Sequence, residues 1–211
     1  MKNIITPVTA TTLTPFAYHS LMVQGGTATL PELIGDCAIS FGLAAALGWI
    51  WARTALPAKN YRRHLGAMPF RSSVFTTDKA GLLPPLACRL NLDDEAGMQR
   101  RFSNATSKGN MKTYFHIQEV PPYQRFSGAV FGLDPFTLTG EEEIIIRIGL
   151  HRNGMVRLRP ASKPLNNVRL NAATARLFGC DLPVNHYCLH NLQLTPELSL
   201  ADALDEVCRW Q

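Results

Sequence analysis

The residues of this chain that could act in catalysis are a few histidines with neighbouring basic or phenolic side chains. His116 follows Lys112 and Tyr114, and His64 follows Tyr61. A histidine beside a lysine or a tyrosine is sufficient for metal-independent RNA cleavage by general acid–base catalysis. The same residue types are common on ordinary protein surfaces, so the spacing leaves both interpretations open.

Metal and nucleophile chemistry have weaker signals. Cys180, His186, Cys188 and His190 lie close in sequence, and on a strand the last three would share one face. The chain has no Cys-x-x-Cys pair, which is the usual spacing of a structural zinc site. We therefore expect a buried strand with thiols there, and no bound metal or cofactor. The chain also has no Gly-x-Ser-x-Gly elbow, no phosphate-binding loop and no Gly-x-Gly-x-x-Gly motif.

The charge distribution favours a polyanionic partner. The formal net charge is +5 and the isoelectric point is about 9.1. Acidic residues are absent from residues 37–77 and from residues 144–180, and both segments contain several basic residues. These two segments could converge on one surface. The alternative is that they form separate solvated faces.

The segment 143–160 is the most informative stretch, because it predicts a β-hairpin around Asn153-Gly154. A two-residue turn would place arginines on the isoleucine face, whereas a three-residue loop at 152–154 pairs Leu150 with Val156 and Ile148 with Leu158. A register change of one residue moves every side chain to the other face. We prefer the three-residue loop, because it separates apolar from basic residues and gives Gly154 a left-handed loop position. The basic face then carries Arg147, Gly149, His151, Met155, Arg157 and Arg159.

A basic sheet face can bind the phosphate backbone of a nucleic acid. The alternative is a solvated strand with ordinary arginines. Further candidates lie elsewhere in the chain, and Tyr61 among them could stack on a base. These additional candidates for RNA contact are Lys59, Tyr61, Arg62, Arg63, Arg71, Arg100, Arg101, Lys108, Lys112 and Arg125.

Local patterns predict the elements that position these residues. Thr29 and Glu32 form a capping-box pattern that begins a helix reaching Gly48. Asn171 and Ser199 are predicted to cap the two later helices, 172–178 and a last helix from 199. A polar stretch at 91–110 has no clear apolar period. The remaining expected elements are strands within 4–18, 70–77 and 112–120, and a basic connection at 56–66.

The composition is that of a globular protein, with 46% hydrophobic and 18% charged residues. The first ten residues do not resemble a signal peptide, and the longest apolar run, 37–51, is shorter than the roughly 20 residues of a membrane span. Five cysteines at irregular spacing favour reduced thiols over a disulfide framework. We therefore expect one domain over residues 1–211, located in the cytoplasm and not in a membrane.

Two segments resemble a known family. The sequence Leu-Pro-Glu-Leu-Ile-Gly-Asp-Cys-Ala-Ile-Ser-Phe-Gly-Leu-Ala-Ala-Ala-Leu-Gly at 30–48, after a Thr-rich first strand, resembles the opening of RAMP proteins from CRISPR effector complexes. The sequence Pro-Pro-Tyr-Gln-Arg-Phe-Ser-Gly-Ala-Val-Phe-Gly at 121–132 resembles the region after the inserted thumb of such proteins. The chain is most similar to the Cas-five group, in particular to its type IV and type I-D members, over residues 4–160.

This resemblance implies an α+β fold, namely a ferredoxin-like (RRM-type) antiparallel sheet with helices on one face and a thumb inserted at 91–112. It implies a non-catalytic subunit of a Cascade-like antiviral ribonucleoprotein. Its partners would be the 5′ handle of the crRNA, the backbone subunits whose filament it caps, the large subunit and, indirectly, target DNA. Two alternatives remain open: a metal-independent endoribonuclease that processes precursor crRNA, and an interaction protein that binds no nucleic acid.

Overall fold

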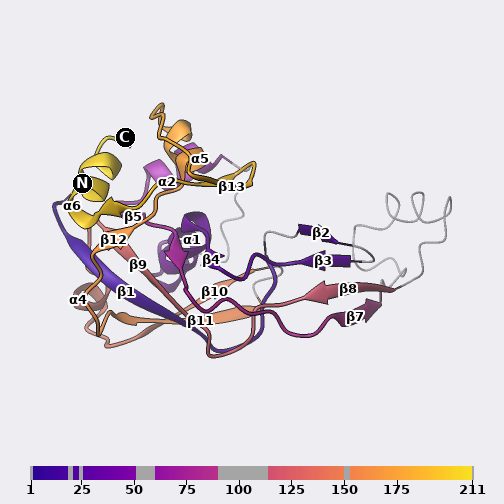
Figure 1. Ribbon diagram of the computed structural model, residues 1–211. Helices are drawn as coiled ribbons and strands as arrows, with labels where there is room; N and C mark the ends of the chain where they lie inside the picture. Colours follow the sequence, from indigo (N-terminus) through magenta and orange to yellow (C-terminus); the bar gives the residue numbers. More distant parts are fainter. Residues whose placement is uncertain are drawn as a thin grey trace.

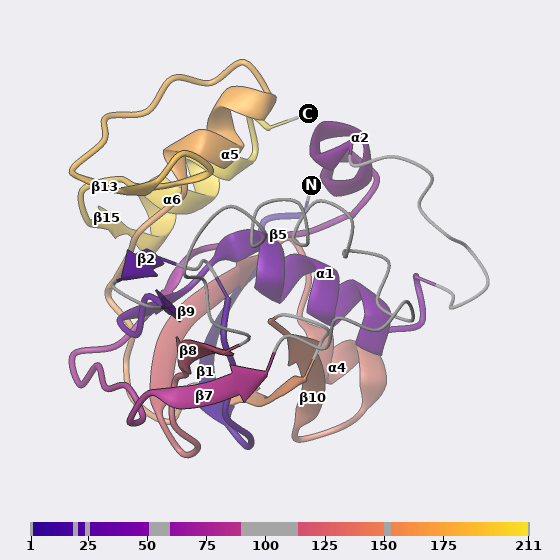
Figure 2. The ribbon, with the colours of Figure 1, turned by 90° about the vertical axis from the view of Figure 1, so that its right-hand side faces the viewer.

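The computed structural model describes residues 2–18, 21–23, 26–50, 60–89, 114–149 and 153–210. The chain forms a mixed α/β structure built on a curled antiparallel sheet, with the helices packed around it (Figures 1 and 2). The main sheet has seven strands in the order β10-β11-β1-β9-β6-β4, with β5 also paired to β9. Their bounds are β1 (Ile5–Thr12), β4 (Leu33–Ile34), β5 (Arg71–Ser72), β6 (Phe75–Thr76), β9 (Arg125–Phe131), β10 (Ile144–Ile148) and β11 (Gly154–Pro160).

The inner face of this sheet packs against α1 (Asp36–Ala46). Along β1 every second residue is buried, so Val8, Ala10 and Thr12 point inward while the residues between them are half-exposed. Gly42 allows the close approach of α1, because a Cβ at this position would lie 3.2 Å from the side chain of Ile146. β1 confirms the strand that was expected within residues 4–18, with the narrower bounds Ile5–Thr12.

The helix predicted from Thr29 begins later than expected, at Asp36, with Gly35 as its N-cap. Leu33 and Ile34 instead form β4, pair with Thr76 and Phe75, and are fully buried. The Thr29 hydroxyl accepts a hydrogen bond from the Tyr18 amide at 3.3 Å. Tertiary strand pairing therefore overrides the local capping pattern.

Residues 161–210 fold over part of the opposite, outer face. The predicted caps are confirmed: Asn171 accepts a hydrogen bond from the Ala173 amide and Ser199 from the Asp202 amide. A second apolar cluster, which includes Phe131, lies between this segment and β9. The elements of the segment are β12 (Asn167–Val168), α5 (Ala172–Leu177), β13 (His186–Leu189), β14 (Leu192–Leu194), β15 (Leu198–Ser199) and α6 (Leu200–Val207).

An arm projects from the main body (Figure 1). It is a four-stranded sheet in the order β2-β3-β8-β7, formed by β2 (Leu21–Val23), β3 (Gly26–Ala28), β7 (Leu86–Arg89) and β8 (Tyr114–Gln118). Leu86 pairs with Ile117 and Arg89 with Tyr114, so β7 and β8 form an antiparallel stem. The predicted thumb, 91–112, lies outside the described residues, between the far ends of this stem.

Two further expectations need correction. The predicted connection 56–66 contains a helix, α2 (Tyr61–Gly66), because the Asn60 side chain caps it by accepting a hydrogen bond from the Arg63 amide. The predicted strand 70–77 is divided into β5 and β6, because Val74 between them forms a bridge with Arg169 in the C-terminal segment.

A short helix, α4 (Pro135–Thr139), follows β9 and is capped by Asp134.

No helix in the described part of the chain is both long enough and apolar enough to cross a membrane. Three of the cysteines, Cys37, Cys180 and Cys188, are free thiols.

Asp36 is a carboxylate buried at the start of α1, where Asn171 Nδ2 donates a hydrogen bond to its Oδ1 at 2.8 Å. Burial raises the pKa of Asp36, and the hydrogen bonds from Thr174 and Asn171 offset only part of this effect. Because the folded state holds the proton more tightly, ionised Asp36 costs stability. This cost increases as the pH rises from the unfolded-state pKa, about 3.9, through the folded pKa.

We therefore expect Asp36→Asn to gain stability relative to the wild type, and this gain should grow with pH above about 4. Urea unfolding at several pH values between about 4 and 8 measures the difference directly. Asp181→Asn is the matched control, because the Asp181 side chain is 91% exposed. A difference between Asp36→Asn and wild type that stays constant over this range would contradict the expectation.

Candidate nucleic-acid interface

The outward-pointing residues of four adjacent strands form a basic surface. Arg157 of β11 pairs with Thr11 of β1, and Thr11 pairs in turn with Arg125 of β9. In the next row, Arg159 pairs with Thr9, and Thr9 with Ser127. We call this surface the arginine face, and its members are Arg125, Arg147, Arg157, Arg159, Thr9, Thr11 and Ser127.

The predicted hairpin exists, but the predicted register is wrong in detail. Ile148 pairs with Gly154 and Ile146 with Val156, so residues 149–153 connect the strands. Gly149 has φ of 84°, which allows the turn to begin there. Gly154 is a strand residue and not the left-handed turn residue we expected, and a Cβ there would lie 2.5 Å from Phe16 Cβ.

The predicted separation of faces is nevertheless confirmed. The register is displaced by an even number of residues, which leaves each side chain on its face. Ile144, Ile146 and Ile148 are buried, while Arg147 is exposed on the other side. Ile145, which we did not assign to the basic face, also lies there and is 44% exposed.

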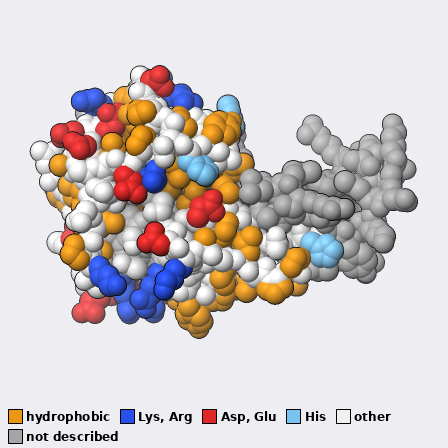
Figure 3. Space-filling view, viewed as in Figure 1, with side chains coloured by type: hydrophobic (Ala, Val, Ile, Leu, Met, Phe, Trp, Pro, Cys, Tyr) orange, Lys and Arg blue, Asp and Glu red, His pale blue; other side chains and the backbone are white. Residues whose placement is uncertain are grey.

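One carboxylate lies among the arginines. Arg159 Nε donates to Glu143 Oε2 at 2.9 Å, and Arg157 Nε lies 3.9 Å from the same oxygen. Such partly exposed pairs contribute about 0–1 kcal/mol each, so they leave the arginines able to exchange partners. Arg125 and Arg147 form no ion pair with any residue in the described ranges. Lys and Arg side chains gather along the lower edge of the body in Figure 3, where Figure 1 places β11.

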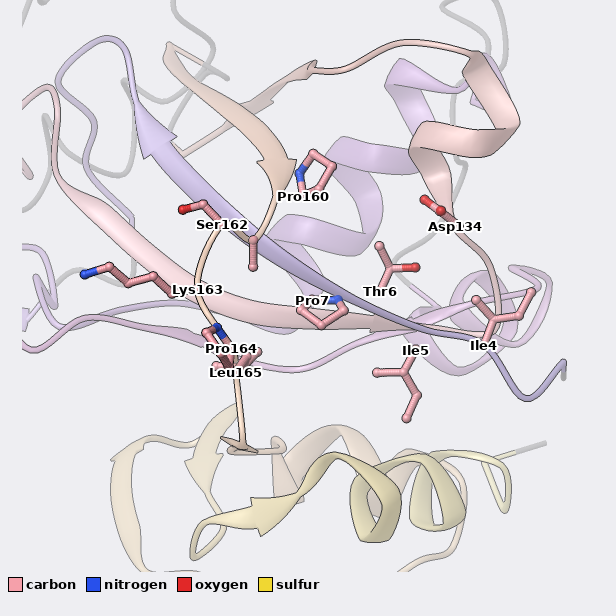
Figure 4. A pocket seen from close by; sticks show the side chains of 11 residues that line it. Ile4, Ile5, Thr6, Pro7, Asp134, Pro160, Ser162, Lys163, Pro164 and Leu165 are labelled. Atoms are coloured by element: carbon pink, nitrogen blue, oxygen red, sulfur yellow. The ribbon is translucent and has the colours of Figure 1, made fainter.

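The C-terminal segment limits the length of this surface. Arg125 and Ser127 are exposed on β9, but Ala129 and Phe131, which point the same way, are buried. A hollow of about 530 Å³ lies beside the start of β1, between that strand and the chain that follows β11 (Figure 4). Lys163 and Pro7 are among the residues lining this hollow. The arginine face is thus open at the turn end of the sheet and covered at the other.

Arg71 does not belong to any surface, which corrects its assignment as an RNA contact. It is 5% exposed, and its Nη1 donates to the carbonyl oxygens of Leu65, Met68 and Phe70 at 2.8–2.9 Å. Its Nη2 donates to the Trp210 carbonyl at 2.8 Å. Burial lowers the pKa of Arg71. This arginine joins the end of α2 to the end of the chain.

Tyr61, Arg62 and Arg63 are exposed on α2, but the structure does not bring them to the arginine face. Figures 1 and 2 both place α2 at the opposite end of the body from β10, and Figure 1 places β11 beside β10. The Tyr61 ring packs edge-on against Phe41, with 5.8 Å between centroids. Six other predicted contacts lie outside the described residues: Lys59, Arg100, Arg101, Lys108, Lys112 and His151.

The candidate catalytic histidines lie in different places. The His64 ring packs edge-on against Phe41 at 6.4 Å. His116 is exposed on β8 of the arm, and its proposed partner Lys112 is outside the described ranges. No group of three His, Cys, Asp or Glu side chains within the described residues could hold a metal ion.

The strand predicted to be buried, β13, is partly exposed: His186 is on the surface and Cys188 is half-buried. Burial raises the pKa of the Cys188 thiol to about 11, so this thiol is protonated at neutral pH.

Sequence reasoning missed the hydroxyl residues of the arginine face. Thr9 and Thr11 alternate with the buried Ala10 and Thr12 in β1, so the period-2 pattern could have identified them. Glu143 belongs to an acidic run, and nothing in the sequence indicates that it contacts Arg159. Lys163 belongs to the acid-free segment, but its place beside β1 depends on the long-range hydrogen bond from the Ala161 amide to the Pro7 carbonyl.

No protein-family model matches this chain, and no characterised protein matches it at a significant level. The geometry of the arginine face and the sequence resemblance therefore carry the functional proposal.

Proposed function

We propose that this protein holds single-stranded RNA on the arginine face. The observation that carries the proposal is the set of arginines that adjacent strands present on one side of the sheet, with threonine and serine hydroxyls between them. Arginines neutralise phosphates, and hydroxyl groups donate hydrogen bonds to phosphate and sugar oxygens. A sheet face that is exposed at one end suits an extended strand better than a globular ligand.

The strand order supports a ferredoxin-like assignment as part of this proposal. The order β11-β1-β9-β6 is antiparallel throughout, α1 lies between β1 and β6 in sequence, and α4 lies between β9 and β11. This order corresponds to the βαββαβ arrangement of ferredoxin-like domains, with β10 as an added edge strand. RRM domains of this type bind RNA on the face of the sheet, and the arginine face is the uncovered part of the sheet face opposite α1.

We further propose that the RNA is the 5′ handle of a crRNA, in a cytoplasmic CRISPR effector complex with backbone subunits and a large subunit. The support is the resemblance of residues 30–48 and 121–132 to the Cas-five group. The stem of β7 and β8 adds to it, because the stem projects from the body and borders the sequence segment 91–112 that the resemblance assigns to the thumb. In this proposal the protein holds RNA without cleaving it.

The direct test is RNA binding at several salt concentrations. We expect the double variant Arg125→Gln, Arg147→Gln to bind labelled single-stranded RNA more weakly. In a plot of log binding constant against log salt concentration, the slope of the variant should be less steep, by about 0.7 for each phosphate that it no longer neutralises. The double variant Arg62→Gln, Arg63→Gln is the matched control, because it removes charge from α2. Equal losses of affinity in both variants would mean that net charge, and not the arginine face, attracts the RNA.

The cellular part of the proposal has its own test, an affinity purification of the tagged protein from its host with sequencing of the recovered RNA. We expect short RNAs that share a constant 5′ end, together with several partner proteins. Recovery of the protein alone would contradict the effector-complex assignment. Cleavage of the RNA by purified wild type, abolished by His116→Ala or His64→Ala, would replace it with the endoribonuclease alternative.

A further inference from the structure

Tyr123 is a tyrosine with an unusual backbone and an unusual exposure. Its φ is 64°, and it is the one non-glycine residue with positive φ among the described residues. Its side chain is 78% exposed, more than any other large hydrophobic residue in the described part of the chain. The left-handed conformation is unfavourable for a residue with a Cβ, and glycine adopts it freely. Tyrosine at this position therefore has a cost that folding alone does not require.

The turn that holds Tyr123 is firmly attached to the end of β1. The Tyr123 amide donates to the Thr12 carbonyl at 2.7 Å, and the buried Thr12 hydroxyl donates to the Pro121 carbonyl at 2.7 Å. The next residue, Gln124, is buried and its Nε2 donates to the Pro31 carbonyl at 2.7 Å. The backbone that carries the exposed ring is thus fixed on both sides of it, and a ligand would not have to order it.

Tyr123 lies at the open end of the arginine face. Arg125 is two residues further along the chain, begins β9 and pairs with Thr11. Tyr123 belongs to the turn before β9, and its amide donates to the carbonyl of Thr12, the last residue of β1. Two residues of an extended chain span about 7 Å at most, so Tyr123 lies close to the row of Arg125 and Arg157.

We propose that Tyr123 is a stacking platform for an unpaired base of the strand whose phosphates lie on the arginine face. This inference rests on the proposed function and specifies its ligand as single-stranded nucleic acid. Bases of a duplex are stacked and paired with their neighbours, whereas an unpaired base exposes a face to an aromatic ring. The arrangement places the proposed base contact, on the turn before β9, next to the proposed backbone contact at Arg125.

The test uses Tyr123→Gly, because the two roles predict different results. If the Tyr123 ring served only the fold, this change would lower the melting temperature. If the ring stacks on a base, the change lowers the affinity for RNA and not the melting temperature. Glycine relieves the left-handed backbone, so we expect a melting temperature equal to or above that of wild type. Binding of single-stranded RNA should weaken by roughly tenfold, which corresponds to one stacked base. Tyr123→Phe should retain wild-type affinity, because stacking needs the ring and not the hydroxyl. Tyr187→Ala is the matched control, since Tyr187 is 62% exposed on β13.

A series of oligonucleotides, each with one abasic position, completes the test. For wild type we expect one position at which loss of the base weakens binding, and this effect should vanish in Tyr123→Gly. DNA of the same sequence should show the same loss on Tyr123→Gly; a loss confined to RNA would overturn stacking in favour of a ribose contact. Unchanged RNA affinity in Tyr123→Gly, with the arginine variants still impaired, would overturn this inference alone. If wild type binds no single-stranded nucleic acid, the proposed function fails as well.

Discussion

Replacing Arg71 with methionine is expected to lower the free energy of unfolding by about 3–5 kcal/mol. The guanidinium satisfies four backbone carbonyls, those of Leu65, Met68, Phe70 and Trp210. Methionine fills a similar volume but donates no hydrogen bond, so these carbonyls lose a charged donor in a buried place. An unsatisfied buried acceptor costs about 1–3 kcal/mol. Removal of the cation–π interaction between the guanidinium and the Phe178 ring, 5.0 Å away, adds to this cost.

Urea unfolding followed by circular dichroism measures the effect. Arg176→Met is the control, because the Arg176 side chain is 46% exposed and pairs with Asp181 on the surface; it should change stability by less than about 0.5 kcal/mol. Arg71→Lys keeps the charge but has no planar fork to reach two separate segments, so we expect an intermediate loss. A loss below about 1 kcal/mol for Arg71→Met would mean that water replaces the guanidinium at these carbonyls.

The second large effect is expected at Gly128, in the middle of β9. A Cβ there would lie 2.4–2.7 Å from three carbons of the Phe75 ring. Phe75 is fully buried, so its ring cannot move away without disturbing the core. We expect Gly128→Val to lose about 3 kcal/mol or more, or to fail to accumulate as folded protein, because overpacking forces neighbouring side chains out of their rotamers.

Two further variants show whether packing causes this loss. Ser127→Val places the same side chain on the neighbouring residue, which is exposed on the opposite face, and should change stability by less than about 1 kcal/mol. Combining Gly128→Val with Phe75→Ala should recover part of the loss relative to the sum of the single variants, since the valine then occupies space left by the ring. Strictly additive losses would show that Gly128 is needed for a reason other than the Phe75 ring.

The sequence was sufficient where the signal was local and periodic. The alternation in the hairpin predicts which of its residues face inward, and Asn171 and Ser199 are recognisable as caps from their residue type and the helices that follow. The hairpin faces were predictable even though the register was not. The face depends on a period of two, which an even displacement preserves.

Long-range contacts explain what the sequence could not predict. Arg71 reads as a surface cation in a basic segment, and only the carbonyl of Trp210, far away in sequence, reveals it as a structural residue. The first helix begins late because Leu33 and Ile34 find strand partners in β6. The open end of the arginine face was unpredictable for the same reason: its limit is set by residues near the C-terminus that cover Ala129 and Phe131.

The cover on β9 also sets a footprint. From Tyr123 to Ser127 the chain advances by at most about 14 Å, and the four strands from β10 to β9 span a similar width. An area of this size accommodates only a few nucleotides, so a longer strand must leave it sideways or continue onto another protein. A footprint this small gives modest affinity by itself, and strong retention would then come from avidity with adjoining surfaces. In the proposed function, the covered half of the sheet limits how many nucleotides this protein holds and leaves the rest of the strand to adjoining proteins.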